Sequence, residues 1–223
     1  LVMRTEHRFT ATAEKGEVSA ILMRPEKASS LIVLGHGASS TMRSPLISNI
    51  AEALFNAGVA TFRYNFPYSE NGRGRDSQAV CVETVRSAIA AAGSLASDLK
   101  IFAGGHSFGG RMTTTAVSME VPELLSGLFL FFFPLHHPGK PAIERAAHLS
   151  DVAVPMLFIS GDRDSLADTV LLERSLAQCP QAELYLAETA DHSFKVLKRS
   201  RTVVADVFDE IAGAAAAWCS KIN

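Results

Sequence analysis

Residues 105–109 read Gly-His-Ser-Phe-Gly, a G-x-S-x-G motif centred on Ser107. The apolar run 101–103 comes before the motif, and residues 111–119 have the pattern of a helix. A serine in a sharp turn between a strand and a helix is exposed at the edge of a sheet, where its hydroxyl can act as a nucleophile. Glycines two positions before and after the serine leave room for a strained backbone. The motif therefore predicts acyl chemistry at Ser107.

A candidate acid and a candidate base follow Ser107 along the chain. The apolar run 154–160 indicates a buried strand, and Asp162 and Asp164 come directly after it. His192 follows the next predicted strand. In this set the histidine would take the Ser107 proton and return it to the leaving group, and the aspartate would orient the histidine. The residues leave both aspartates open as the acid.

Simpler interpretations exist for each of these residues. Ser107 could be the small residue that a glycine-rich turn requires, and His192 could be a surface or capping histidine. Asp191 adjoins the histidine and adds a third aspartate to the candidates. The serine–aspartate–histidine order favours the catalytic interpretation over these alternatives.

Six blocks that cover nearly the whole chain carry a family resemblance. They are residues 34–39, 62–68, 104–111, 133–141, 159–164 and 191–194. With these blocks in this order, the sequence resembles the α/β-hydrolase superfamily. More narrowly, it is similar to the cap-less branch related to dienelactone hydrolases and to the Tex30/KANSL3-type hydrolase-like proteins. Dienelactone hydrolases carry cysteine as the nucleophile, whereas this chain has Ser107, so their specific activity is not expected here.

The resemblance implies a mostly parallel central sheet with helices on both faces and no sizeable cap. Its G-x-x-D pattern after the acid strand falls on Asp164 and leaves Asp162 as a turn residue. The backbone N–H groups of Phe108, which follows the nucleophile, and of Ala38 would form the oxyanion hole. His36 would hold the Ala38 loop through hydrogen bonds.

Alternating apolar patterns predict a single α/β domain over residues 1–223. The predicted strands are residues 4–12, 18–24, 31–34, 59–64, 101–103, 128–133, 154–160 and 183–186. The predicted helices are residues 45–56, 77–95, 111–119, 142–148, 169–178 and 201–220. The first two strands should form an antiparallel pair at one edge, and the others a mostly parallel sheet. The candidate residues follow strands, where such sheets bind ligands.

Composition narrows the classes of partner. The formal net charge of −2 gives no electrostatic reason to expect nucleic acid or an anionic membrane as a partner. No stretch has the length of a signal-peptide core or a membrane span. Three widely spaced cysteines without a C-x-x-C motif favour a reducing, cytoplasmic setting. We expect no cofactor, and the sequence does not indicate the oligomeric state.

Several further residues are predicted to lie near the site. Tyr64, Tyr68, His36 and His136 are candidates for lining a substrate pocket, although such residues more often brace loops. His136 and His137 lack a third ligand at a suitable spacing, so we expect no metal site.

The polar loop 71–76 contains Arg73 and Arg75. Either arginine could recognise an anion, but a solvated loop is the simpler interpretation.

The sequence therefore predicts a serine hydrolase that cleaves an ester, thioester or related acyl bond of a small-molecule substrate through an acyl-enzyme. The alternative is a hydrolase-like binding or scaffold protein, because the resemblance includes proteins better regarded as complex subunits than as enzymes. The presence of serine, acid and histidine together favours the enzyme.

Overall fold

The computed structural model describes residues 3–222, so residues 1–2 and 223 of the predicted domain lie outside it. Eight strands form one sheet in the order β1-β2-β4-β3-β5-β6-β7-β8. Their bounds are β1 Met3–Thr12, β2 Gly16–Arg24, β3 Ser30–Gly35, β4 Ala60–Tyr64, β5 Lys100–His106, β6 Leu125–Phe131, β7 Met156–Gly161 and β8 Ala182–Ala187. β2 runs antiparallel to both of its neighbours, and every pairing from β4 to β8 is parallel.

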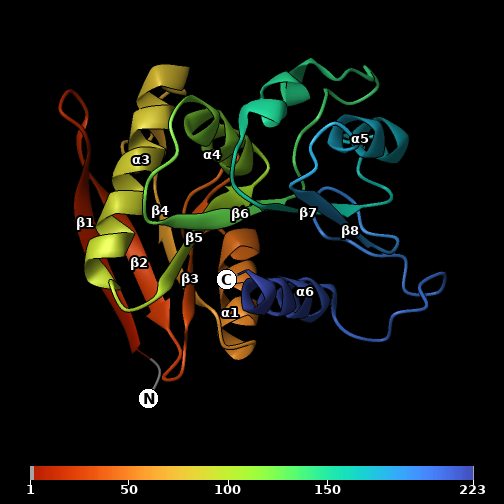
Figure 1. Cartoon of the computed structure of the whole chain (residues 1–223), viewed down its shortest axis with the longest axis horizontal. Coiled ribbons are helices and arrows are strands. Elements are labelled where there is room, and N and C mark those ends of the chain that lie inside the picture. Colours follow the sequence, from red (N-terminus) through yellow and green to blue (C-terminus); the bar gives the residue numbers. More distant parts are fainter. Residues whose placement is uncertain (1–2, 223) are drawn as a thin grey trace.

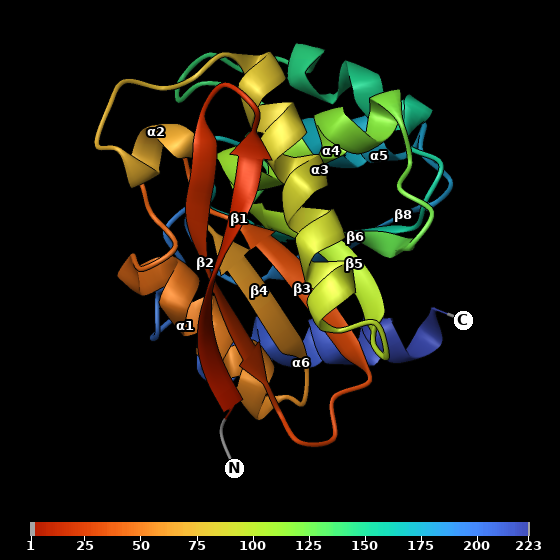
Figure 2. The same cartoon turned by 90° about the vertical axis from the view of Figure 1, so that its left-hand side faces the viewer.

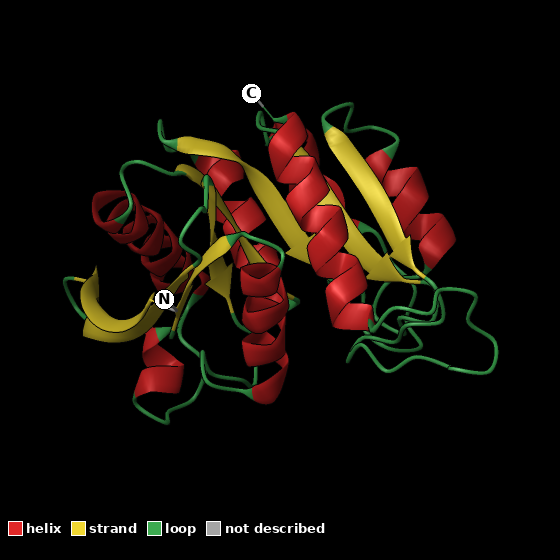
Figure 3. Ribbon diagram, turned by 90° about the horizontal axis from the view of Figure 1, so that it is seen from below, coloured by secondary structure: helices red, strands yellow, loops and turns green. Residues whose placement is uncertain are grey.

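Helices cover both faces of this sheet (Figures 1 and 3). One face packs against α3 (Gln78–Leu95), α4 (Phe108–Met119) and α5 (Thr169–Leu176), and the other against α1 (Pro45–Asn56) and α6 (Val207–Lys221). The parallel strands β3 and β7 are buried along their whole length because both of their faces are covered. The predicted α/β-hydrolase fold, with its mostly parallel sheet, is confirmed.

Two short helices lie in loops at the carboxyl ends of the parallel strands. α2 (Pro67–Glu70) follows β4, and the 3-10 helix η1 (Glu144–Asp151) lies between β6 and β7. Within the described residues, the β6–β7 connection contains no other helix or named strand, so no sizeable cap covers this edge of the sheet. At the far edge, β1 and β2 form a long antiparallel pair beside α3 (Figure 2).

Several predicted boundaries differ from the structure. The last helix starts at Val207 rather than at residue 201, because Asp206 caps it and accepts a hydrogen bond from the N–H of Phe208. The strand predicted at 128–133 is β6, which starts at Leu125 and ends before Phe132, where φ is 55°. The helix predicted at 142–148 is η1, which has 3-10 geometry.

Candidate active site

Ser107 lies in a strained turn between β5 and α4. Its φ of 51° is in the left-handed region, which residues other than glycine seldom adopt. Two backbone hydrogen bonds hold the turn: the Ser107 N–H donates to the Phe131 carbonyl (2.9 Å), and the Arg111 N–H donates to the Ser107 carbonyl (3.0 Å). The neighbouring strand and the first turn of α4 thus fix where the serine backbone lies.

The glycines around Ser107 are required by close contacts with the neighbouring strands. A Cβ at Gly105 would lie 2.2 Å from the Gly35 carbonyl oxygen, and one at Gly109 would lie 2.3 Å from the Gly35 carbonyl carbon. A Cβ at Gly104 would lie 1.7 Å from the Phe129 oxygen. The motif glycines were predicted to serve the turn itself, but the backbones of β3 and β6 also exclude a side chain there.

His192 connects Ser107 to Asp164. The His192 Nε2 atom lies 2.9 Å from Ser107 Oγ, and Nδ1 lies 2.9 Å and 2.8 Å from the two carboxylate oxygens of Asp164. Asp164 has no exposed side-chain surface, and its Oδ1 also accepts the Leu166 N–H at 2.8 Å. An ionised carboxylate can only accept, so Nδ1 carries the proton and Nε2 is free to accept the serine hydroxyl proton.

The other two candidate aspartates do not reach the histidine ring. Asp162 is exposed in the same turn as Asp164. The Asp191 Oδ1 atom accepts the N–H groups of Ser193 and Lys195, at 2.9 Å and 3.0 Å, and so shapes the loop that carries His192. Of the three, Asp164 alone is bonded to His192.

The two predicted oxyanion donors come from two different segments of the chain. Phe108 is the first residue of α4, where a backbone N–H has no partner within the helix. Ala38 lies in the loop after β3, and the Tyr68 hydroxyl donates to its carbonyl at 2.8 Å. This bond connects the Ala38 loop to α2.

His36 is fully buried and holds the Ala38 loop by a hydrogen bond to the Gly37 carbonyl. The Phe66 N–H donates to His36 Nε2 (3.2 Å), so Nδ1 carries the proton and donates to the Gly37 carbonyl (2.8 Å). Burial lowers the pKa of His36 to about 4, so the ring is neutral at pH 7. His36 therefore positions the loop and cannot line an open pocket.

Tyr64 was predicted to line a pocket, and this prediction is wrong. Its side chain has no exposed surface because β4 lies between two sheet neighbours and beneath a helix. Burial raises the pKa of its hydroxyl. Tyr68, by contrast, borders a surface hollow of about 410 Å³ together with Ala38, Arg73 and Arg75.

His136 is also buried and braces the loop that carries the acid. The Asp168 N–H donates to His136 Nε2 (2.9 Å), so Nδ1 donates to the His137 carbonyl (2.9 Å). The His136 N–H donates to the Leu166 carbonyl at 2.9 Å. Its predicted role in lining a pocket is replaced by support for the segment between Asp164 and Asp168.

His106 was missed by the sequence analysis. Its Nε2 atom lies 3.1 Å from the His192 carbonyl oxygen, which can only accept, and the two imidazole rings are 5.2 Å apart. Burial lowers the pKa of His106 to about 3, with a smaller effect from His192. A histidine that precedes the serine at the end of a buried strand was the available signal.

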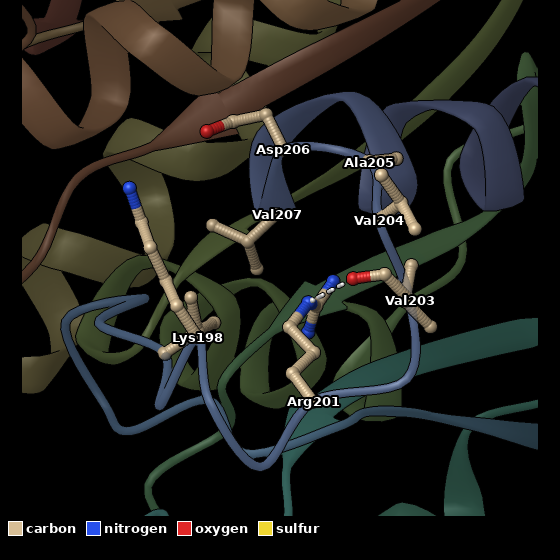
Figure 4. Close-up of a pocket in the computed structure, with 8 residues that line it drawn as sticks. Lys198, Arg201, Val203, Val204, Ala205, Asp206 and Val207 are labelled. Carbon is tan, nitrogen blue, oxygen red and sulfur yellow. Dashed lines mark hydrogen bonds between the residues drawn. The ribbon is translucent and has the colours of Figure 1, made fainter.

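A buried ion pair fixes the long segment after His192. Arg201 pairs with Glu210 of α6, and their side chains are 3% and 6% exposed. The Arg201 guanidinium also donates to the carbonyls of Glu188 and Val203, and Figure 4 shows the Val203 bond beside a hollow of about 430 Å³. The predicted helix start at residue 201 fails because Arg201 serves as this anchor.

Known proteins share the fold of this chain. A family model described as an alpha/beta hydrolase domain matches residues 28–220. The chain belongs to this α/β-hydrolase family. The α/β-hydrolase is similar in fold to a dienelactone hydrolase from Anabaena variabilis, with a TM-score of 0.75, 20% identity and 98% of each chain covered.

Two further solved structures share the fold of this α/β-hydrolase. One is Est1E from Butyrivibrio proteoclasticus with bound ferulic acid (TM-score 0.74, 16% identity, 92% and 95% coverage). The other is a serine hydrolase without a lid from Xanthomonas campestris (TM-score 0.70, 16% identity, 98% and 94% coverage). Among residues 3–222 of the α/β-hydrolase, no helix has the length and apolar character needed to cross a membrane.

Proposed function

We propose that this α/β-hydrolase cleaves an ester, thioester or related acyl bond with Ser107 as the nucleophile, His192 as the general base and Asp164 as the orienting acid. One observation carries the proposal: His192 Nε2 lies 2.9 Å from Ser107 Oγ, and Nδ1 lies 2.8 Å from the buried Asp164 carboxylate. A base within hydrogen-bond distance of a hydroxyl can remove its proton as the hydroxyl attacks.

The reaction would have two halves. In the first, Ser107 Oγ attacks the carbonyl carbon, His192 takes the serine proton, and the protonated imidazole passes that proton to the leaving group. In the second, His192 removes a proton from water, which attacks the acyl-enzyme, and the proton returns to Ser107 Oγ as the acid is released. Asp164 stabilises the imidazolium in both halves and stays ionised.

The negative charge of each tetrahedral intermediate would rest on the N–H groups of Ala38 and Phe108. Phe108 is suited to this role because its N–H has no helix partner, and the Tyr68 hydroxyl holds the Ala38 peptide. Without a sizeable cap the site stays open, which favours small acyl groups, or an exposed acyl group on a larger molecule.

The decisive experiment is intact-mass analysis after treatment with a fluorophosphonate probe. We expect one adduct on the wild type and none on Ser107→Ala. Ser94→Ala is the matched control, because Ser94 is exposed on α3 and should leave labelling unchanged. A folded wild type without an adduct would contradict the proposal and favour the binding or scaffold alternative.

We propose that the protein acts in the cytoplasm on a small-molecule acyl substrate. Cys81, Cys179 and Cys219 are all free and buried, which is compatible with a reducing cytoplasm. Panels of short esters and thioesters with matched acyl groups would identify the scissile bond after the labelling experiment.

A further inference from the structure

Four arginines near Ser107 form no ion pair. Away from the site, Arg8, Arg24, Arg43, Arg86 and Arg201 pair with carboxylates, whereas the described arginines Arg4, Arg63, Arg163, Arg174 and Arg199 do not. Near the site, Arg73, Arg75, Arg111 and Arg145 have no carboxylate within 4.0 Å among residues 3–222. In a protein with a net charge of −2, a group of unpaired cations beside the nucleophile calls for a ligand of opposite charge.

The Arg75 guanidinium lies over the ring of Phe108, the residue that follows Ser107. Its guanidinium carbon lies 4.9 Å from the centre of the Phe108 ring, and Phe66 and Tyr68 pack against the same ring at 5.5 Å and 6.3 Å. The Arg75 guanidinium has no hydrogen-bond partner within residues 3–222, so its N–H groups are free to bind an anion while its charge lies over the ring. Arg75 is therefore oriented next to the proposed oxyanion hole.

The nearby carboxylates are directed elsewhere. Asp76, the neighbour of Arg75, pairs with Lys15 at 3.2 Å. Glu70 of α2 accepts hydrogen bonds from Ser19 and Asn65. No acidic residue lines the hollow beside Ala38, whose described lining is Ala38, Ser39, Ser40, Thr41, Tyr68, Ser69, Gly72, Arg73 and Arg75.

Arg111 and Arg145 lie on the facing sides of α4 and η1. His148 Nε2 lies 2.7 Å from Thr114 Oγ1, which joins the two helices. Arg111 precedes Thr114 by three residues and Arg145 precedes His148 by three, so each arginine shares a helix face with one of these residues. Arg111 also lies three residues beyond Phe108, on the same side of α4.

The two arginines differ in how much of their hydrogen-bonding capacity is free. Arg145 donates to the carbonyls of Pro134 and His136 at 3.3 Å and 3.4 Å. The half-buried guanidinium of Arg111 has no hydrogen-bond partner within residues 3–222. Burial, followed by the charges of Arg145 and Arg75, lowers the pKa of Arg111. Binding of an anion would relieve this repulsion.

We propose that Arg75 and Arg111 bind an anionic group of the acyl substrate, either a carboxylate or a phosphate, while Arg145 adds to the positive potential. This inference rests on the proposed function and names its substrate class. The bound anion would lie next to Phe108, so it would hold the scissile carbonyl close to Ser107 Oγ and raise kcat/KM.

The test compares a charged substrate with a neutral one of similar shape. The pair consists of the para-nitrophenyl hemiester of glutarate and the same compound with its free carboxylate converted to a methyl ester. The corresponding phosphonobutyrate ester tests a phosphate-like anion. The measured quantity is the ratio of kcat/KM for the charged ester to kcat/KM for the neutral ester. We expect this ratio to exceed one in the wild type.

The variants remove one positive charge each. Arg75→Gln and Arg111→Gln should each lower the ratio about tenfold, because each loses a charge-assisted hydrogen bond. Arg174→Gln, on the exposed side of α5, removes the same charge away from the site and should keep the wild-type ratio. Arg75 is exposed, so its variant should fold even if the Arg111 variant does not. An unchanged ratio in Arg75→Gln would overturn the proposal.

Calorimetry separates this proposal from the proposed function. Glutarate and phosphonobutyrate are titrated into the wild type and into the same three variants. Binding that weakens about tenfold in Arg75→Gln but not in Arg174→Gln supports the anion site, and the tighter ligand identifies the anion. If no ester is cleaved and no probe adduct forms, the proposed function fails, and these titrations decide the anion site alone. Equal binding by wild type and Arg75→Gln overturns it.

Discussion

The two loops on either side of Ser107 are held in different ways. The loop with Ala38 is anchored by neutral groups: the buried His36 ring and the Tyr68 hydroxyl bond its carbonyls. The segment around His192 is anchored by charged groups, with Asp164 on the ring and Arg201 on the Glu188 carbonyl. The proposed oxyanion hole thus depends on a neutral network, and the proposed base on charged groups together with the neutral His106.

This difference follows from what each loop must do. A peptide N–H that stabilises an oxyanion needs a fixed position, which neutral hydrogen bonds in a buried site provide. A base that becomes positively charged in each cycle needs a nearby negative charge, and Asp164 supplies it. The long irregular segment that follows His192 needs a separate anchor, and Arg201 with Glu210 provides one.

The largest expected effect comes from the Arg201–Glu210 ion pair, which anchors the segment after His192. Arg201→Leu should lower the free energy of unfolding by about 3–5 kcal/mol, because the buried Glu210 carboxylate would lose its ion-pair partner. Urea unfolding measures this change. The exposed pair Arg24–Asp98 is the control, and Arg24→Leu should cost less than about 1 kcal/mol. Similar losses in the two variants would mean that the Arg201 pair is not a special anchor.

The second prediction concerns how the stability contributed by His36, beside the Ala38 loop, and by His106, beside His192, depends on pH. His36 and His106 have lowered pKa values of about 4 and about 3 in the folded protein, against 6.5 as an ordinary value. Below pH 6.5 the unfolded chain binds protons that the folded chain does not, so stability is full above pH 6.5 and falls as the pH drops. Each histidine should contribute about 1.4 kcal/mol per pH unit between pH 6 and pH 4.5.

Urea unfolding at several pH values tests this slope. His148, whose pKa is also lowered by burial, adds to it in the same direction. His36→Gln and His106→Gln should each flatten the slope by a similar amount. A slope that one variant flattens and the other leaves intact would show that only one of the two loops is sensitive to acid.

The third prediction isolates the contact between His106 and the base. His106→Phe removes the donor to the His192 carbonyl and should lower kcat about tenfold with little change in KM. His106→Gln can restore a donor and should recover part of the loss. A merely structural role would lower stability without moving the ratio of kcat to KM, so the split between the two constants is the readout.

The smallest expected effect comes from the neutral hydrogen bond between the Tyr68 hydroxyl and the Ala38 loop. Tyr68→Phe deletes the hydroxyl that donates to the Ala38 carbonyl and should lower kcat about fivefold, equivalent to one neutral hydrogen bond of about 1 kcal/mol. Steady-state kinetics on a short ester measures it. Ser87→Ala is the control, because it also deletes a hydroxyl that donates to a backbone carbonyl, that of Ala11 in β1, away from the site. An equal loss of kcat in both variants would show that the Tyr68 hydroxyl has no particular role in positioning Ala38.

Much of the site could be predicted from local patterns in the sequence. The turn at Ser107, the α/β alternation and the order of serine, acid and histidine follow from apolar periodicity and motif spacing. The choice of Asp164 over Asp162 needed the family pattern, since both lie in the same turn. The geometry bonds Asp164 to His192 and leaves Asp162 exposed.

The remaining features depend on contacts between residues far apart in sequence. Tyr64 and His36 follow or end strands that could border a pocket, but their neighbours in the sheet bury them completely. The sequence pattern predicts that the last helix starts at Arg201. The pairing of Arg201 with Glu210, which makes Arg201 an anchor outside that helix, becomes visible only in the folded structure. The place of His106 at the end of a buried strand was a signal in the sequence, but its role depends on the His192 carbonyl, which only the fold brings to its ring.

The uncovered connection between β6 and β7 has a consequence for the fate of an acyl group on Ser107. Without a sizeable cap, that group faces water at its bulk concentration, so water would outcompete most alcohols or amines as the acceptor and hydrolysis would prevail over transfer. No opening or closing motion of a cap would then time the release of product. Turnover would be set by bond making and breaking at the serine, and by how fast substrate arrives.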